Sequence, residues 1–179
     1  MIITIGGKPG SGKSTIAKLL AKKLNYKHYS NGDFMREMAE GKNLSLLELS
    51  KLAETDKTID EELDKKQIEL GKIEDNLVID SRLGFHFIPN SIKIFLEADL
   101  DIRARRILAD KIRHELNTNL EEAKSNIAKR ENSENKRYSG YYSINPYDTK
   151  NFNLIIDTSN LLPEQIASQI LDFVNQKAL

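Results

Sequence analysis

Short apolar runs alternate along the chain with longer segments in which apolar residues recur every three or four positions. Runs that are apolar at successive positions and end in glycine or a polar turn are typical of buried parallel strands. They predict strands at residues 2–5, 77–79, 92–96 and 153–156, with a further short strand at residues 27–30.

The segments between these strands predict helices. After the first strand, Ile16, Leu19, Leu20 and Leu24 recur at helical spacing and leave lysines on the opposite face. Strands that alternate with helices indicate a parallel sheet covered on both faces, and therefore one α/β domain with three α/β/α layers and a five-stranded parallel sheet. Further helices are predicted over residues 34–40, 45–53, 59–71, 101–116 and 120–138 and from Pro163 onward, with a turn at residues 31–33 and a loop over residues 141–151.

Composition narrows the class of protein. The chain has 179 residues, enough for one domain with a substantial core. Its 27 Lys+Arg balance 27 Asp+Glu, so no global positive field favours nucleic acid. Cysteine is absent, which excludes disulfides, thiolate metal sites and cysteine nucleophiles.

Neither a membrane span nor a signal peptide is expected. No apolar run approaches the roughly 18–20 residues that cross a bilayer. A strand that begins at Ile2 leaves no room for a charged segment followed by an apolar one. We therefore expect a cytosolic monomer with neither a membrane partner nor a nucleic-acid partner.

The most specific motif joins the first strand to the first helix. Residues 7–14 match G-x-x-x-x-G-K-[ST], the pattern of a P-loop. Glycines let successive N–H groups converge on phosphate oxygens, and the following helix N-terminus favours negative charge. Lys13 is expected to neutralise the β and γ oxygens of ATP, and the Ser14 hydroxyl to ligate Mg²⁺. The residues assigned to ATP by this motif are Gly7, Lys8, Pro9, Gly10, Ser11, Gly12, Lys13, Ser14 and Thr15.

The motif alone does not separate kinases from other P-loop proteins. A GTPase should carry D-x-x-G after a strand and N-K-x-D late in the chain. Here the first glycine after Asp80 is four residues later, at Gly84, rather than three. The Asn135-Lys136 pair is not followed by the aspartate of N-K-x-D. The chain also has no LSGGQ pattern of an ABC-type ATPase. A small-molecule kinase is the class that remains.

Seven segments follow the order and spacing of a known kinase family, namely residues 7–14, 30–36, 59–67, 78–83, 103–107, 129–138 and 155–159. Through them the sequence resembles the nucleoside monophosphate kinases, and more closely the archaeal-type cytidylate kinases, over essentially its whole length. Asn31 stands where many relatives have a small residue, and Asp80-Ser81-Arg82 stands where they often have Glu/Asp-Gly-Arg. The resemblance implies a helical insert that binds the nucleoside monophosphate (NMP), at residues 31–73, and a helical lid at residues 108–148.

Two arginines are candidates for the acceptor phosphate. Arg36 and Arg82 each follow the carboxyl end of a predicted strand, where an open parallel sheet forms its ligand crevice. Guanidinium groups grip phosphate bidentately, and the resemblance implies this role for both. The alternative for either is a solvated surface charge. Asp80, at the end of the third strand, is expected to hold the water shell of Mg²⁺, with a turn aspartate as its alternative.

Recognition of the acceptor base is predicted on one helix face. Asp60, Asp64 and Gln67 lie at i, i+4 and i+7 and therefore share that face. A carboxylate accepts from an exocyclic amine, and an amide pairs with donor and acceptor edges. A solvated polar face is the equally weighted alternative.

The charged segment that follows is expected to close over ATP. Arg130 and Arg137 lie seven residues apart, close to two helical turns, and so project from one side. We expect both to reach the transferring phosphoryl group as the lid excludes water, the alternative being a surface helical hairpin. The resemblance implies that Arg106 stacks on the adenine of ATP.

Together these patterns predict a kinase that transfers the γ-phosphoryl group of ATP, with Mg²⁺, to CMP or dCMP. The nearest alternative is the same chemistry on AMP, UMP or a shikimate-like acceptor. An assembly factor that couples ATP turnover to a partner is a more distant one.

Overall fold

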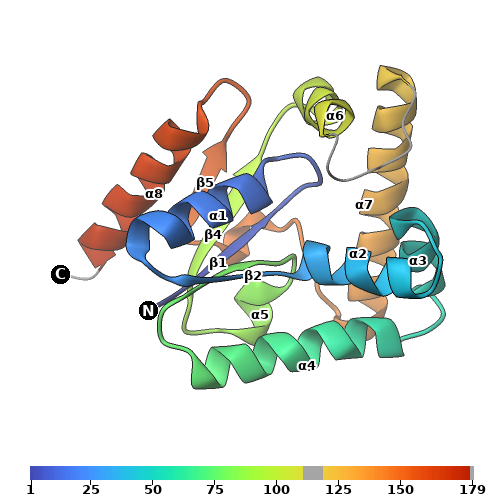
Figure 1. Ribbon diagram of the computed structural model, residues 1–179, viewed down its shortest axis with the longest axis horizontal. Coiled ribbons are helices and arrows are strands. Elements are labelled where there is room, and N and C mark those ends of the chain that lie inside the picture. The colour runs from blue at the N-terminus through green and yellow to red at the C-terminus, as the bar shows by residue number, and fades with distance from the viewer. Residues whose placement is uncertain (111–118, 178–179) are drawn as a thin grey trace.

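The computed structural model describes residues 1–110 and 119–177 (Figure 1). Its centre is a five-stranded sheet in the order β2-β3-β1-β4-β5, in which every pair of neighbours is parallel. The predicted α/β fold with a five-stranded parallel sheet is therefore confirmed. The strands are β1 (Ile2–Gly7), β2 (Lys27–Ser30), β3 (Leu77–Asp80), β4 (Ile92–Glu97) and β5 (Leu154–Asp157).

Helices cover the sheet and extend beyond it. The helices α1 and α8 contact each other on one face, α5 contacts β1 on the other, and α7 packs against both α3 and α6 (Figure 1). The helices are α1 (Lys13–Leu24), α2 (Asn31–Gly41), α3 (Leu46–Leu52), α4 (Thr58–Ile73), α5 (Gly84–Phe87), α6 (Leu100–Ala109), α7 (Leu120–Tyr142) and α8 (Pro163–Lys177), with a 3₁₀ turn, η1 (Thr149–Asn151). None of the helices within the described ranges is long and apolar enough to cross a membrane.

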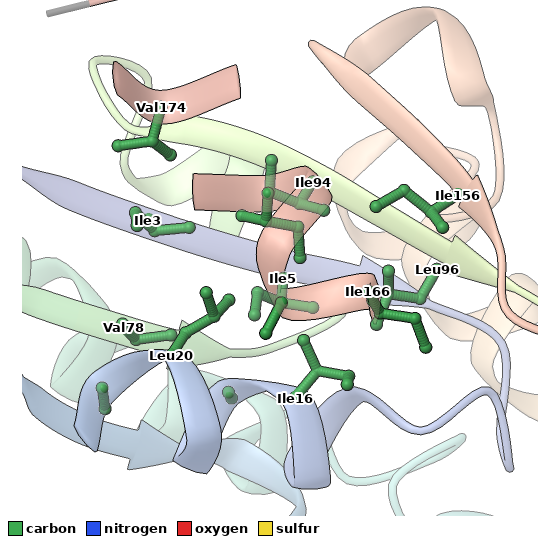
Figure 2. Close-up of a cluster of buried hydrophobic side chains, with 14 residues drawn as sticks. Ile3, Ile5, Ile16, Leu20, Val78, Ile94, Leu96, Ile156, Ile166 and Val174 are labelled. Carbon is green, nitrogen blue, oxygen red and sulfur yellow. The ribbon is translucent and has the colours of Figure 1, made fainter. Parts of the chain in front are cut away.

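The largest core cluster lies between the sheet and the pair α1 and α8. Figure 2 shows Ile3 and Ile5 of β1 directed toward Leu20 of α1 and Ile166 of α8. Side chains alternate along a strand, so Thr4 between the two isoleucines faces the opposite side, where its hydroxyl meets that of Ser91 at 2.9 Å. The core thus fixes β1 and α1, the two elements that flank the P-loop.

Four segments differ from the sequence prediction. Residues 31–33 form the first turn of α2 rather than a turn before it, because the Ser30 hydroxyl accepts the N–H of Asp33 and caps the helix there. Helix α7 continues to Tyr142, into the predicted loop. Helix α6 ends at Ala109, and the rest of its predicted range, residues 111–116, lies outside the described residues. The short helix α5 was not predicted.

The first strand continues through two glycines that were predicted to end it. A Cβ at Gly7, where φ is +136°, would lie 2.0 Å from the carbonyl oxygen of Leu96 in β4. Only glycine allows both this backbone conformation and this approach. The close contact brings the start of the P-loop against the centre of the sheet.

Replacing Leu20 with alanine tests the core that carries the P-loop. The side chain is fully buried between α1 and the sheet, so Leu20→Ala should lower the free energy of unfolding by about 2–5 kcal/mol. Urea denaturation followed by circular dichroism measures the change. Lys22→Ala, at an exposed position of the same helix, is the control and should change stability by less than about 0.5 kcal/mol. Equal effects of the two substitutions would contradict this packing.

Candidate active site

The P-loop turns through two glycines in the left-handed region, Gly10 (φ 78°) and Gly12 (φ 94°), and enters α1 at Lys13. The Lys13 ammonium donates to the Lys8 carbonyl oxygen at 2.8 Å. Burial, together with the nearby charge of Arg82, lowers the pKa of Lys13 well below its usual value. A polyphosphate at the loop would oppose this shift and favour the charged amine.

Oxygen donors lie together at the end of β3. The Ser14 hydroxyl donates to the Asp80 carboxylate, and the Ser30 hydroxyl lies 3.3 Å from the same oxygen. Hard oxygen ligands of this type suit Mg²⁺, which keeps several waters and takes further ligands from phosphates. No cluster of three or more His, Cys, Asp or Glu side chains suited to a metal occurs within residues 1–110 and 119–177. The pair therefore fits a magnesium ion held jointly with a nucleotide.

Two cavities meet at the P-loop. One lies between the P-loop, the insert formed by α2 to α4, and α7. The other lies between the P-loop, α6 and the start of α8. Four residues line both: Gly10, Ser14, Arg36 and Ile107. Molecules bound in the two cavities would therefore face each other across the P-loop.

Glu134 of α7 organises the cationic wall of the first cavity. Its carboxylate accepts from Arg82 Nε at 2.6 Å, from Arg130 Nε at 3.2 Å and from the Tyr147 hydroxyl at 2.5 Å. Burial alone would raise the pKa of Glu134, but the two guanidinium groups lower it to about 2. Glu134 is therefore ionised and holds Arg82 and Arg130 side by side.

A second buried ion pair joins the insert to α7. Arg137 Nη1 lies 3.0 Å from each oxygen of Asp60, and each side chain is only 2% exposed. Burial raises the pKa of Asp60 to about 6, although Arg137 opposes the shift. The Arg137 Nε is buried without a hydrogen-bond partner among the described residues. Both groups line the first cavity.

The two other polar residues of the predicted helix face also line this cavity. Asp64 accepts from the Tyr142 hydroxyl, and burial raises its pKa to about 6. Gln67 Oε1 accepts from the Ser81 hydroxyl at 2.5 Å, and that hydroxyl accepts in turn from Asn31 Nδ2 at 3.2 Å. The i, i+4, i+7 spacing thus placed all three side chains toward one cavity.

Helix α7 is bonded to the insert along its C-terminal half. The Ser133 hydroxyl donates to the Ser50 carbonyl at 3.2 Å, and the Tyr141 hydroxyl donates to the Ala53 carbonyl at 2.8 Å. Lys136 Nζ lies 2.6 Å from a Glu54 carboxylate oxygen. With the Asp60–Arg137 pair, these contacts tie the insert and this part of α7 into one unit.

The remaining predicted site residues lie at the edges of the two cavities. Arg36 lines both and donates to Asp33. Arg106 lines the second cavity, where its Nη1 and Nη2 donate to the Thr158 hydroxyl and carbonyl at 2.9 and 2.7 Å. Ser11, Gly12 and Thr15 line the second cavity, Pro9 and Lys13 line the first, and Gly7 and Lys8 are not among the residues that line either.

Sequence reasoning missed Glu134 and Tyr147. Glu134 lies four residues after Arg130 and three before Arg137, a spacing that places it on the arginine face of α7. That spacing was the available signal. Tyr147 lies in a loop, and no sequence pattern pointed to it.

Comparison with known proteins places the chain in a family. Residues 2–160 match the cytidylate kinase-like family. A cytidylate kinase of Sulfolobus acidocaldarius is 42% identical over 183 residues, which cover 100% of this chain and 97% of that protein. A cytidylate kinase of Methanobrevibacter smithii is 40% identical, with 96% of each chain covered.

Solved structures show the same fold at low sequence identity. An uncharacterized protein from Eubacterium ventriosum superposes with a TM-score of 0.73 at 20% identity and 98% coverage of both chains. A shikimate kinase from Bacteroides thetaiotaomicron superposes with a TM-score of 0.67 at 15% identity and the same coverage. The fold likeness agrees with the sequence match, and this chain belongs to the cytidylate kinase-like family.

Proposed function

We propose that this protein is a cytidylate kinase that transfers the γ-phosphoryl group of ATP to CMP or dCMP and releases ADP with CDP or dCDP. The observation that carries the proposal is a P-loop that opens onto a cavity lined by buried and partly buried arginines, in a chain about 40% identical to cytidylate kinases over its length. The P-loop accounts for the donor, and the arginines for an acceptor that already carries phosphate.

The second cavity suits the donor nucleotide. Its floor is the P-loop from Gly10 to Gly12, where N–H groups converge before α1 begins. Arg106, Ile107 and Pro163 line the region beyond, so a planar base can lie between a guanidinium group and apolar side chains. In this proposal Lys13 leaves the Lys8 carbonyl and binds the β and γ oxygens.

Mg²⁺, where bound, would be held by the Ser14 hydroxyl and by water molecules that Asp80 orients. The ion would supply positive charge to the phosphate oxygens during transfer. The chain contributes the position of these two oxygens, which the end of β3 and the start of α1 bring into contact.

The first cavity suits the acceptor. Among the described residues, Arg82 donates to Glu134 through its Nε only. Its two Nη groups can therefore donate to another partner. Those groups match the two oxygens of a phosphate. Arg36, which lines both cavities, lies where the acceptor and donor phosphates would approach each other.

The helix face of α4 is proposed to read the base and sugar. Asp60 and Asp64 can accept from an exocyclic amine or a sugar hydroxyl, and Gln67 offers an amide donor. Their hydrogen bonds to Arg137, Tyr142 and Ser81 fix each side chain before a ligand arrives. Fixed polar groups discriminate strongly between bases, because a wrong base leaves them unpaired.

Transfer itself requires no general base. The second pKa of a phosphate monoester is about 6, so the acceptor phosphate is already a nucleophilic dianion at neutral pH. The protein orients the two phosphates in line. Lys13, Arg82, Arg130 and Arg137 stabilise the negative charge that develops on the oxygens of the transferring phosphoryl group. We assign residues 31–73 to acceptor binding and residues 108–148 to the lid, of which residues 111–118 lie outside the described residues, and we assign the active species to a monomer.

Lys13→Ala tests the donor site. Loss of the ammonium should lower kcat about 100- to 1000-fold, because it removes charge directed at the transferring phosphoryl group. Steady-state kinetics with ATP and CMP measures the loss, and circular dichroism checks the fold. Lys22→Ala, which removes an exposed lysine from the same helix, should keep wild-type kcat. Near-normal turnover in Lys13→Ala would refute the proposed site.

Arg82→Lys tests the acceptor site. The substitution keeps a cation beside Glu134 but loses the planar fork, so KM for CMP should rise about tenfold or more while KM for ATP changes less than twofold. Initial rates at varied CMP and varied ATP separate the two constants. The control is Arg105→Lys, at an exposed position of α6, which should alter neither. Equal increases in both constants would argue against the assignment.

An acceptor panel tests the function as a whole. We expect ATP-dependent formation of a diphosphate from CMP and dCMP, with at least tenfold lower kcat/KM for UMP, AMP and shikimate. Coupled detection of ADP, with the product identified by chromatography, provides the measurement. A preference for AMP or shikimate would show that CMP is not the acceptor. ATP hydrolysis at the same rate with and without each acceptor would overturn the kinase proposal.

A further inference from the structure

Two carbonyl groups of the P-loop are contacted from other elements, one by Arg103 of α6 and one by Thr158, which follows β5. Arg103 Nη1 donates to the Pro9 carbonyl at 3.2 Å. The Thr158 hydroxyl, which accepts from Arg106, lies 3.0 Å from the Ser11 carbonyl. The two contacts fall on either side of Gly10.

Holding these carbonyls sets the direction of the neighbouring amides. In a planar trans peptide, the carbonyl of one residue and the N–H of the next point in opposite directions. The contact of Pro9 with Arg103 therefore turns the N–H of Gly10 away from α6, at a residue that lines both cavities. The Thr158 hydroxyl has one proton for two carbonyl groups at 3.0 Å, those of Ser11 and Glu97, and when it donates to Ser11 it has the same effect on the N–H of Gly12. Side chains of α6 and Thr158 thus help to aim the amides that would bind phosphate.

The Arg103 guanidinium depends on a carboxylate from α7. Its Nη1 also lies 2.5 Å from a Glu131 oxygen, and its Nε donates to the Ala98 carbonyl at 3.0 Å. Arg103 is only 5% exposed, and Glu131 is its one carboxylate partner among the described residues. A buried guanidinium that loses its counter-ion tends to reorient toward water. Such a movement would release the Pro9 carbonyl.

From these contacts we infer that Glu131 is a positioning residue for the donor site, acting through Arg103 on the Pro9–Gly10 peptide. The same guanidinium nitrogen contacts α7 and the P-loop, so the position of α7 is coupled to the orientation of a phosphate-binding amide (Figure 1 shows α6 next to α7). The backbone of Arg103 reinforces the coupling. A Cβ at Gly10 would lie 2.7 Å from the Arg103 carbonyl oxygen, so loop and helix are in direct contact.

This inference rests on the proposed binding of ATP at the P-loop and predicts an effect confined to ATP. Glu131→Gln keeps the size of the side chain but removes its charge, and should raise KM for ATP and the ATP dissociation constant about tenfold. The KM for CMP should change less than the KM for ATP, because the amide that moves belongs to the P-loop, which is proposed to bind the phosphates of ATP, and neither Glu131 nor Arg103 lines the acceptor cavity. Initial-rate kinetics and calorimetric titration of ATP without acceptor measure these quantities.

A matched control separates this coupling from the general attachment of α7 to α6. Asp101 of α6 and Lys124 of α7 form another ion pair between these helices, at 2.9 Å, and Asp101 is exposed. Asp101→Asn breaks that pair without touching the P-loop and should leave the ATP constants within twofold of wild type. Similar ATP constants in Glu131→Gln and Asp101→Asn would overturn the inference.

A double-mutant cycle tests the route through Arg103. In an Arg103→Gln background, Glu131→Gln should have no further effect on ATP binding, whereas additive effects would contradict the route. Should Arg103→Gln fail to fold, the comparison of Glu131→Gln with Asp101→Asn still tests the role of Glu131. A wild-type protein that binds ATP but does not phosphorylate CMP would refute the proposed acceptor, and the calorimetric comparison would still test Glu131.

Discussion

The ion pairs between buried cations and buried carboxylates are the interaction on which the site depends. Lys13, Arg82, Arg130 and Arg137 surround one cavity, and removing each charge from water costs several kcal/mol when it is left unpaired. Glu134 holds two of the arginines and Asp60 holds a third. Without these carboxylates the cations would repel one another and turn toward solvent.

The same pairs connect distant parts of the fold. Glu134 joins α7 to Arg82, just after β3, and Asp60 joins α4 to α7. A phosphate that enters the cavity meets cations that are already in place, so binding requires little rearrangement of the guanidinium groups. Pre-organisation of this kind suits phosphoryl transfer, in which positioning and charge rather than proton transfer lower the barrier.

A feature of this structure is predictable from the sequence when the residues that form it lie close together along the chain. The P-loop is contiguous, and its glycines and lysine meet local backbone and charge requirements, so its pattern was recognisable. The parallel sheet followed from four apolar runs. By contrast, the Glu134 cluster joins residues 82, 130, 134 and 147, of which the i, i+4 spacing of 130 and 134 encodes only one contact locally. Likewise, no local pattern predicted that Arg103 lies buried in contact with the P-loop.

The turn predicted at residues 31–33 was wrong because a helix cap determines the local structure there. Asn31, Gly32 and Asp33 are turn-forming residues, but the Ser30 hydroxyl accepts the Asp33 N–H and makes them the first turn of α2. Asp60, Asp64 and Gln67, which were predicted to share one helix face, all line the first cavity. Its partners were not predictable, because Arg137, Tyr142 and Ser81 come from other elements.

The fold and the acceptor are encoded in different parts of the chain. A shikimate kinase from Bacteroides thetaiotaomicron shares this architecture at 15% identity, so the sheet and its covering helices are compatible with widely different sequences. The first cavity is formed instead by the insert and α7, and their contacts are particular to the side chains there, such as Arg137 on Asp60 and Tyr142 on Asp64. The matches to cytidylate kinases cover 96–100% of this chain. In the proposed function, the few polar side chains that the insert and α7 fix against each other determine the acceptor.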